Sequence, residues 1–236
     1  MSDIHFINGE KGGVGKSFVC RAMTAYHLAR QSDCAIYDAD RTSADVLRTY
    51  GELAGVKRAV FSEGEEFDTA ANAIFNTALS GQRVLVNLPA QVMPALSMWL
   101  EENEVFEMAA DGGVAFYNWF VSDSELDSLM LFEQSLDRFE DNMRHVFVAN
   151  YGKTKKWDLL TKNKPLMERM RRMDVTVVKF PKFLGSDDCK LINKLSLPFE
   201  AVATHEAFDA FGRQHAKSFL KKAFDAFDAS EVFVDE

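Results

Sequence analysis

The sequence KGGVGKS, residues Lys11–Ser17, follows closely on the apolar stretch Ile4–Ile7. Three glycines in so short a loop let the backbone take positive φ and bring consecutive N–H groups close to an anion. After the loop, apolar residues recur every three or four positions, which predicts an amphipathic helix over Lys16–Gln31. A glycine turn that binds nothing is the simpler interpretation. Strand, glycine loop, Lys-Ser and helix in this order instead predict a binding site for a nucleoside triphosphate with Mg²⁺.

Each residue type in the loop has a predicted part in binding. Lys16 is expected to reach the β- and γ-phosphates, and the Ser17 hydroxyl to ligate Mg²⁺. The residues predicted to hold the nucleotide here are Gly12, Gly13, Val14, Gly15, Lys16, Ser17 and Phe18.

One departure from the general pattern sharpens the assignment. The pattern G-x-x-x-x-G-K-[ST] places a glycine where this chain has Glu10, and a second lysine, Lys11, stands at the start of the loop. This arrangement resembles the deviant Walker A motif of the ParA/MinD family of ATPases. The resemblance is strong over Ile4–Asp45, weaker through Pro89, and topological beyond. It implies that Lys11 crosses a dimer interface to the nucleotide of the partner subunit, in a homodimer that forms on ATP binding.

Length and composition favour one domain. With 236 residues, of which 47% are hydrophobic, the chain can bury a sizeable core, and we expect a single ParA/MinD-like domain over residues 1–236. The apolar runs are strand-sized, and the N-terminus has neither the basic start nor the apolar stretch of a secretion signal, so a cytoplasmic protein is expected. Cys20, Cys34 and Cys189 are widely spaced, which favours reduced thiols.

Apolar, β-branched runs alternate with helical patterns along the chain. This alternation predicts an α/β P-loop NTPase fold, a mostly parallel sheet with helices on both faces, and a ligand beyond the carboxyl ends of the strands. Strands are predicted over Ile4–Asn8, Cys34–Tyr37, Arg58–Phe61, Val84–Leu88, Val114–Val121, His145–Asn150 and Val175–Phe180. Further helices are predicted over Thr69–Leu79, Pro94–Met108, Ser124–Asn142, Lys164–Met173, Asp187–Leu195 and His205–Phe227.

The second predicted strand leads into two carboxylates, Asp38 and Asp40. By resemblance to the D-x-D switch of the family, Asp38 belongs to the Mg²⁺ water shell and Asp40 to the attacking water. Phosphoryl transfer depends on positioning and charge neutralisation, so a carboxylate that orients water suits it. A turn that happens to be acidic is the simpler alternative. The predicted catalytic residues are Lys11, Lys16 and Asp40.

The fourth predicted strand carries Asn87 where the family usually has its Walker B aspartate. An amide oxygen can accept a hydrogen bond from a metal-bound water but brings no negative charge, so Mg²⁺ should be held less firmly. The predicted metal residues are therefore Ser17, Asp38 and Asn87. Ala90 and Gln91 also replace a glycine that the family commonly has after its proline. These departures predict slow, partner-stimulated hydrolysis.

The ends of two later predicted strands carry candidate residues for binding the adenine base. Asn150 resembles the family position whose side chain reads the adenine edge, and Pro181 would supply the wall on which the base rests. Asn150 can also be read simply as a turn residue at a strand end.

Charge is unevenly distributed. The chain carries −9 overall, but Lys153–Lys194 holds twelve Lys/Arg against five acids, a net +7 that leaves −16 for the remainder. Such a segment can hold nonspecific DNA or an acidic partner, or it can be an ordinary solvated face. The chain ends in the acidic stretch Glu231–Glu236, which anionic lipid would repel, so no membrane anchor is expected there.

Three functions are compatible with these features. The first is an ATP-dependent dimerising switch that partitions plasmid or chromosomal DNA, or positions another cargo, with a protein partner that stimulates hydrolysis. The second is a poorly hydrolysing ATP-binding regulator of a conjugation, secretion or transcription complex. The third is a P-loop metabolic enzyme that phosphorylates a small carboxylate, for which no dedicated acceptor site is evident.

Overall fold

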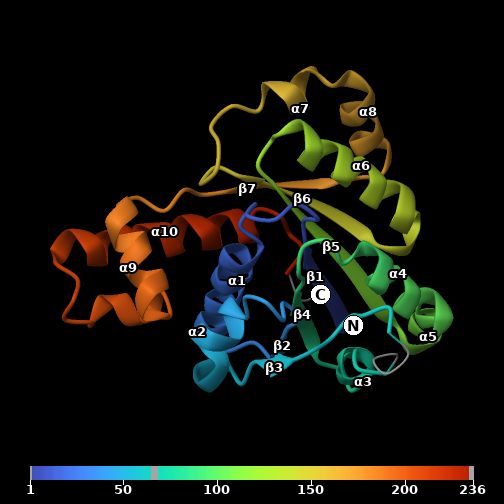
Figure 1. Ribbon diagram of the computed structural model, residues 1–236, viewed down its shortest axis with the longest axis horizontal. Helices are drawn as coiled ribbons and strands as arrows, with labels where there is room; N and C mark the ends of the chain where they lie inside the picture. Colours follow the sequence, from blue (N-terminus) through green and yellow to red (C-terminus); the bar gives the residue numbers. More distant parts are fainter. Residues whose placement is uncertain (1, 65–68, 234–236) are drawn as a thin grey trace.

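A computed structural model describes residues 2–64 and 69–233. Within these ranges the strands form one sheet in the order β3-β2-β4-β1-β5-β6-β7, and every neighbouring pair is parallel (Figure 1). The strands are β1 Ser2–Asn8, β2 Cys34–Asp38, β3 Lys57–Arg58, β4 Arg83–Asn87, β5 Val114–Ser122, β6 Arg144–Asn150 and β7 Thr176–Phe180. The predicted parallel α/β architecture is confirmed.

Helices cover both faces of the sheet (Figure 1). On one face lie α1 Lys16–Arg30, α2 Asp45–Ala54, α9 Ser186–Leu195 and α10 Ala210–Asp228. On the other lie α3 Asn72–Leu79, α4 Met93–Glu102, α5 Val105–Gly112, α6 Leu126–Phe139, α7 Asp158–Lys162 and α8 Lys164–Arg172. Short 3₁₀ turns occur at Glu140–Asn142 and Glu200–Ala203.

The alternation of side chains along the central strand divides the core. Ile4 and Phe6 of β1 pack toward α3 and α4, whereas Ile7 packs toward α1, and all three are fully buried. Successive side chains of a strand point to opposite faces, so a strand apolar at nearly every position needs helices on both sides. Burial of each large apolar side chain contributes about 1.5–3 kcal/mol.

Several predicted elements differ from the structure. The predicted strand Arg58–Phe61 reduces to Lys57–Arg58, although Phe61 is buried beneath α4. The predicted helix Pro94–Met108 divides into α4 and α5 because Glu104 takes a left-handed conformation, with φ of 49°. Helices α2 and α7 were not predicted.

The last predicted helix begins later than expected, at Ala210, where the Asp209 side chain accepts a hydrogen bond from Gly212 N. Within residues 2–64 and 69–233, no helix has the length and apolar character needed to cross a bilayer. The acidic end considered above includes residues 234–236, which lie outside the described residues.

Candidate functional site

The glycine loop lies between the end of β1 and the start of α1, at the carboxyl edge of the sheet. Gly13 and Gly15 take positive φ, 81° and 104°, and Gly15 is the N-cap of α1. A Cβ on Gly15 would lie 2.5 Å from Asn150 Nδ2, so only glycine fits there. Gly12 does not take positive φ, contrary to the expectation for all three glycines.

Lys16 is bonded to the backbone at the end of β1. Its Nζ donates a hydrogen bond to the Gly9 carbonyl at 2.7 Å, and the residue is 7% exposed. Burial lowers the pKa of Lys16, and the nearby charges of Glu10 and Asp40 oppose that effect. The Glu10 carboxyl is itself buried, and burial raises its pKa. The loop therefore contains a partly balanced charge pair that the motif alone does not indicate.

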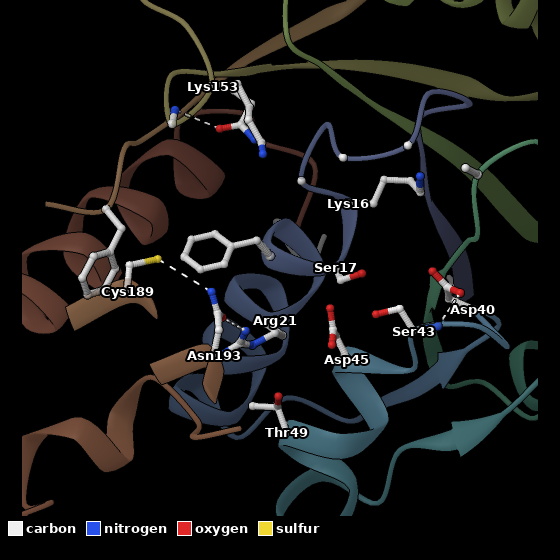
Figure 2. A pocket seen from close by; sticks show the side chains of 18 of the residues that line it. Lys16, Ser17, Arg21, Asp40, Ser43, Asp45, Thr49, Lys153, Cys189 and Asn193 are labelled. Atoms are coloured by element: carbon white, nitrogen blue, oxygen red, sulfur yellow. Dashed lines mark hydrogen bonds between the residues drawn. The ribbon is translucent and has the colours of Figure 1, made fainter. Parts of the chain in front are cut away.

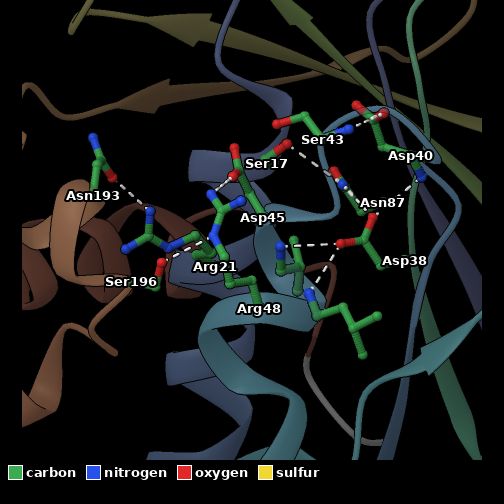
Figure 3. Close-up of polar contacts among 12 residues, drawn as sticks. Ser17, Arg21, Asp38, Asp40, Ser43, Asp45, Arg48, Asn87, Asn193 and Ser196 are labelled. Atoms are coloured by element: carbon green, nitrogen blue, oxygen red, sulfur yellow. Dashed lines mark hydrogen bonds and ion pairs between the residues drawn. The ribbon is translucent and has the colours of Figure 1, made fainter.

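The three predicted metal residues converge where β2 and β4 end beside α1 (Figure 3). Asn87 Nδ2 donates to Asp38 Oδ1 at 2.9 Å and to Ser17 Oγ at 3.4 Å. Asn87 Oδ1 is fully buried and has no hydrogen-bond partner among the described residues. The hydroxyl and the carboxylate are oxygen donors that suit an octahedral Mg²⁺ that keeps several waters, whereas Asn87 turns its amide nitrogen toward both of them. The residues fit this metal.

Asp38 also organises the next helix. Its Oδ2 accepts hydrogen bonds from Val46 N at 3.0 Å and Leu47 N at 2.9 Å, and its Oδ1 accepts a third from Asp40 N at 3.2 Å. Burial raises the pKa of Asp38 against these bonds. A carboxylate at the N-terminus of α2 is favoured by the helix dipole. Asp38 therefore connects the predicted metal site to the start of α2.

Asp40 shapes the loop that leads to α2. Its Oδ1 accepts from Thr42 N, Thr42 Oγ1 and Ser43 N at 2.8–3.0 Å. Within the described residues, its Oδ2 makes no hydrogen bond, and the side chain lines the same cavity as Lys16 (Figure 2). One oxygen thus holds the loop while the other faces the space above Ser17.

Lys11 is paired within its own chain. Its Nζ lies 3.2 Å from Asp123 Oδ2 and 3.8 Å from Asp127 Oδ2, at the junction of β5 and α6. Partial burial lowers the pKa of Lys11, but the hydrogen bond to Asp123 outweighs this effect and the pKa is raised. In this state the side chain is directed away from the chain's own phosphate loop.

The candidates for the base line the cavity from the β6 and β7 side. Asn150 Nδ2 donates to Val14 O at 2.7 Å and its Oδ1 accepts from Gly152 N at 2.9 Å, so it ties the glycine loop to the loop after β6. Pro181 and Phe18 line the same cavity, and the Phe18 ring lies 5.0 Å from that of Phe199. Asn150 therefore holds the turn after β6, and it also lines the cavity in which a base is predicted, so the two interpretations do not exclude each other.

The cavity is larger than the motif predicts, about 1240 Å³, and it extends between α1, α2 and α9 (Figure 2). Pockets for a single small ligand commonly enclose about 300–1,000 Å³. The extension includes Arg21 of α1, Arg48 of α2 and Asn193 of α9, none of which was predicted. Arg21 lies four residues after Ser17, the one local signal that it shares a face of α1 with the motif.

The basic segment Lys153–Lys194 does not lie in one place. Lys153, Lys182 and Lys190 line the cavity, whereas α8 carries its own group on the far side of β7 (Figure 1). Arg169 of α8 is paired with Asp137 at 2.6 Å.

Comparison with known proteins places the fold. No family model and no curated protein matches the chain. Septum site-determining protein MinD from Pyrococcus horikoshii OT3, solved with Mg-ADP, is 16% identical over 99% of this chain and 100% of its own, with a TM-score of 0.56. MinD from Aquifex aeolicus is 12% identical over 97% and 98%, with a TM-score of 0.55. Signal recognition particle receptor FtsY from Elizabethkingia anophelis is 14% identical over 93% and 65%, with a TM-score of 0.52.

At these identities the likeness shows the fold alone. The resemblance to ParA/MinD proteins that the loop suggested is confirmed at this level: the chain has the α/β P-loop NTPase fold of MinD.

Proposed function

We propose that this chain is an ATP-dependent switch protein that dimerises when it binds Mg·ATP and hydrolyses it slowly. The observation that carries the proposal is the convergence of Ser17, Asp38 and Asn87 beside Lys16, with the buried Asn87 Oδ1 left without a partner in the described part of the chain. MinD from Pyrococcus horikoshii, solved with Mg-ADP, supports the choice of ligand.

The chain's own residues perform the switch by exchanging partners. Lys16 leaves the Gly9 carbonyl for phosphate oxygens, and Ser17, Asp38 and Asn87 hold Mg²⁺ directly or through its waters. Bound Mg²⁺ neutralises charge on the phosphates. Asp40, through its second carboxylate oxygen, orients a water near the terminal phosphate. An amide at Asn87 leaves the site one negative charge poorer than a carboxylate would, so turnover is slow.

Dimerisation depends on Lys11. In the free chain this lysine is neutralised by Asp123 and Asp127; in the dimer it leaves them for the nucleotide of the partner subunit. Lys11 can reach the phosphates of a partner's nucleotide only in the dimer, and this differential contact would shift the equilibrium toward the dimer when nucleotide is bound. The closed dimer then binds DNA or another cargo.

The test is nucleotide calorimetry together with light scattering of the wild type, Lys11→Ala and Lys16→Ala. We expect Mg·ATP to bind the wild type and convert monomer to dimer. Lys11→Ala should bind nucleotide and stay monomeric, because it lacks only the group that crosses the interface. Lys16→Ala should lose nucleotide affinity itself. A wild type that takes up no adenine nucleotide would end the proposal.

A second candidate is a regulator that binds ATP and scarcely turns it over, working within a conjugation, secretion or transcription complex. The uncharged Asn87 favours it, since the metal site is built but electrostatically weak. Phosphate release measured with and without DNA separates the two functions: a switch ATPase is stimulated by its cargo, and a regulator remains near zero.

A further inference from the structure

The extension of the cavity is bounded by α1, α2 and α9 and lies below the nucleotide site. Arg21 follows Ser17 by four residues, which displaces it about 6 Å along the axis of α1. Figure 2 shows its side chain on the same side of α1 as Asn193 and below Ser17. The residues predicted for phosphate, metal and base leave this part of the cavity without an assigned ligand.

Arg21 is a cation in a buried position. It is 4% exposed, and it donates to Asn193 Oδ1 at 2.7 Å and to Leu197 O at 3.1 Å. Its guanidinium lies 4.7 Å from the centroid of the Phe199 ring. Within residues 2–64 and 69–233, its Nε has no hydrogen-bond partner and no carboxylate lies within ion-pair distance of it. A buried charge is normally paired, because its desolvation is otherwise uncompensated.

The surrounding wall is also basic. Arg48 donates from Nε to Ser196 Oγ at 2.9 Å and pairs through another nitrogen with Asp45, which leaves part of its guanidinium facing the space near Arg21 (Figure 3). The cavity as a whole is lined by six Lys/Arg and two Asp, a local +4 on a chain of −9: Lys16, Arg21, Arg48, Lys153, Lys182, Lys190, Asp40 and Asp45. A concave basic surface concentrates small anions.

We propose that the space between α1, α2 and α9 is a second binding site, for a small molecule whose carboxylate or phosphate group pairs with Arg21. Guanidinium recognises both groups through parallel N–H···O bonds, and this pairing would give Arg21 a counter-ion. Arg48, Thr49 and Asn193 offer further polar contacts. The site goes beyond the proposed function and does not require nucleotide hydrolysis.

The experiment titrates two probes, succinate and inorganic phosphate, into the wild type, Arg21→Gln, Arg21→Lys and Lys16→Ala by calorimetry. We expect Lys16→Ala to bind succinate as the wild type does, because Lys16 belongs to the neighbouring site. Phosphate can also bind the glycine loop of the wild type, so the Arg21 variants are compared for phosphate in the Lys16→Ala background. Arg21→Gln should bind the probe at least about tenfold more weakly, as expected when a charge-assisted bond is removed. Arg21→Lys should fall between, because it keeps the charge and loses the fork. The better of the two probes identifies the anionic group.

Mg·ATP binding to each variant separates this proposal from the previous one. Arg21→Gln should still bind nucleotide and lose the probe, whereas Lys16→Ala should do the reverse. The proposal is overturned if Arg21→Gln binds succinate as the wild type does, if it binds phosphate unchanged in the Lys16→Ala background, if Lys16→Ala abolishes succinate binding, or if neither probe binds at millimolar concentration.

A second measurement uses protein in which Arg21 is unchanged, so that its result does not depend on whether the Arg21 variants fold. Cys189 lines the cavity, and Cys34 lies at the opposite end of the sheet, at the start of β2. In Lys16→Ala protein the better probe should slow alkylation of Cys189 and leave Cys34 unchanged. Equal rates with and without that probe would contradict the proposed location.

Discussion

Asn87 lies at the end of β4 with its amide nitrogen 2.9 Å from a carboxylate oxygen of Asp38, while its amide oxygen has no partner among the described residues. The amide is a donor toward Asp38, which an aspartate could not be. Asn87 therefore stabilises a carboxylate that is only 2% exposed. The same side chain limits how much negative charge the metal site can present.

Asn87→Asp should destabilise the metal-free protein and make its stability depend on Mg²⁺. Two buried carboxylates would face each other in place of a hydrogen-bonded pair, which should reduce the free energy of unfolding by about 2 kcal/mol. Urea unfolding in EDTA and in millimolar Mg²⁺ measures this, with Asn87→Leu as the control that should not respond to the metal. An equal reduction in both buffers would show that the metal does not bind here.

The glycine loop and the strand-end polar residues were predictable because each depends on a few consecutive residues. Lys16, Ser17, Asp38, Asp40, Asn87, Asn150 and Pro181 all lie at the carboxyl edge of the sheet, as expected. The partners of Lys11 and Arg21 were not predictable, since those interactions join residues more than 100 positions apart.

At the scale of elements, α2 shows why local patterns fail. It has no capping side chain of its own; its first N–H groups are bonded by Asp38, eight residues before Val46. Gly51 lies inside the helix and weakens the pattern further. The prediction of a strand over Arg58–Phe61 is wrong for a different reason. The apolar residues after β3 are buried by packing against α4, but they do not pair with a neighbouring strand.

The last turn of α1 contains a buried histidine, His27, that should make the free energy of unfolding depend on pH. His27 is 2% exposed, its Nδ1 lies 2.7 Å from Ser32 Oγ, and its Nε2 has no hydrogen-bond partner within the described ranges. Burial, with His5 and Arg83 nearby, lowers the pKa of His27 from 6.5 to about 3. Between these two pH values His27 is protonated in the unfolded chain and neutral in the folded chain. The free energy of unfolding therefore has its full contribution from His27 above pH 6.5 and loses it as the pH falls.

His27→Gln should reduce this dependence. The wild type should lose up to about 1.4 kcal/mol of unfolding free energy per pH unit through this group, and the variant should not. Urea unfolding at pH 7, 6 and 5 gives the two slopes, and their difference isolates His27 from the acidic groups common to both proteins. Parallel slopes would mean that His27 is protonated in the folded chain.

At the scale of the whole molecule, the basic segment separates into the cavity wall and the exposed face of α8. Lys164, Arg171 and Arg172 of α8 are exposed, and they lie apart from the acidic remainder of the chain in the sequence. A phosphate backbone that followed this helix would meet these three exposed cations together with the exposed acids Glu168 and Asp174. For the DNA binding considered under the proposed function, α8 is the candidate surface.

Random duplex DNA should therefore be retained at low salt in the presence of Mg·ATP, and less as salt is raised. Replacing Lys164, Arg171 and Arg172 together by Ala should weaken retention and reduce the salt slope by up to about 0.9 for each phosphate that is no longer neutralised. The matched control removes three exposed lysines of α10, Lys217, Lys221 and Lys222, with the same change of charge. Equal weakening in the two triple variants would assign the effect to net charge.

The amide of Asn150 joins two loops that are 136 residues apart in the chain. Because it bonds both the carbonyl of Val14 and the N–H of Gly152, it fixes the gap between the surface that meets phosphates and the surface that would meet a base. A ligand gripped at both ends has to match that gap. In the nucleotide site proposed above, this fixed spacing would select ligands by the length between their base and their phosphates.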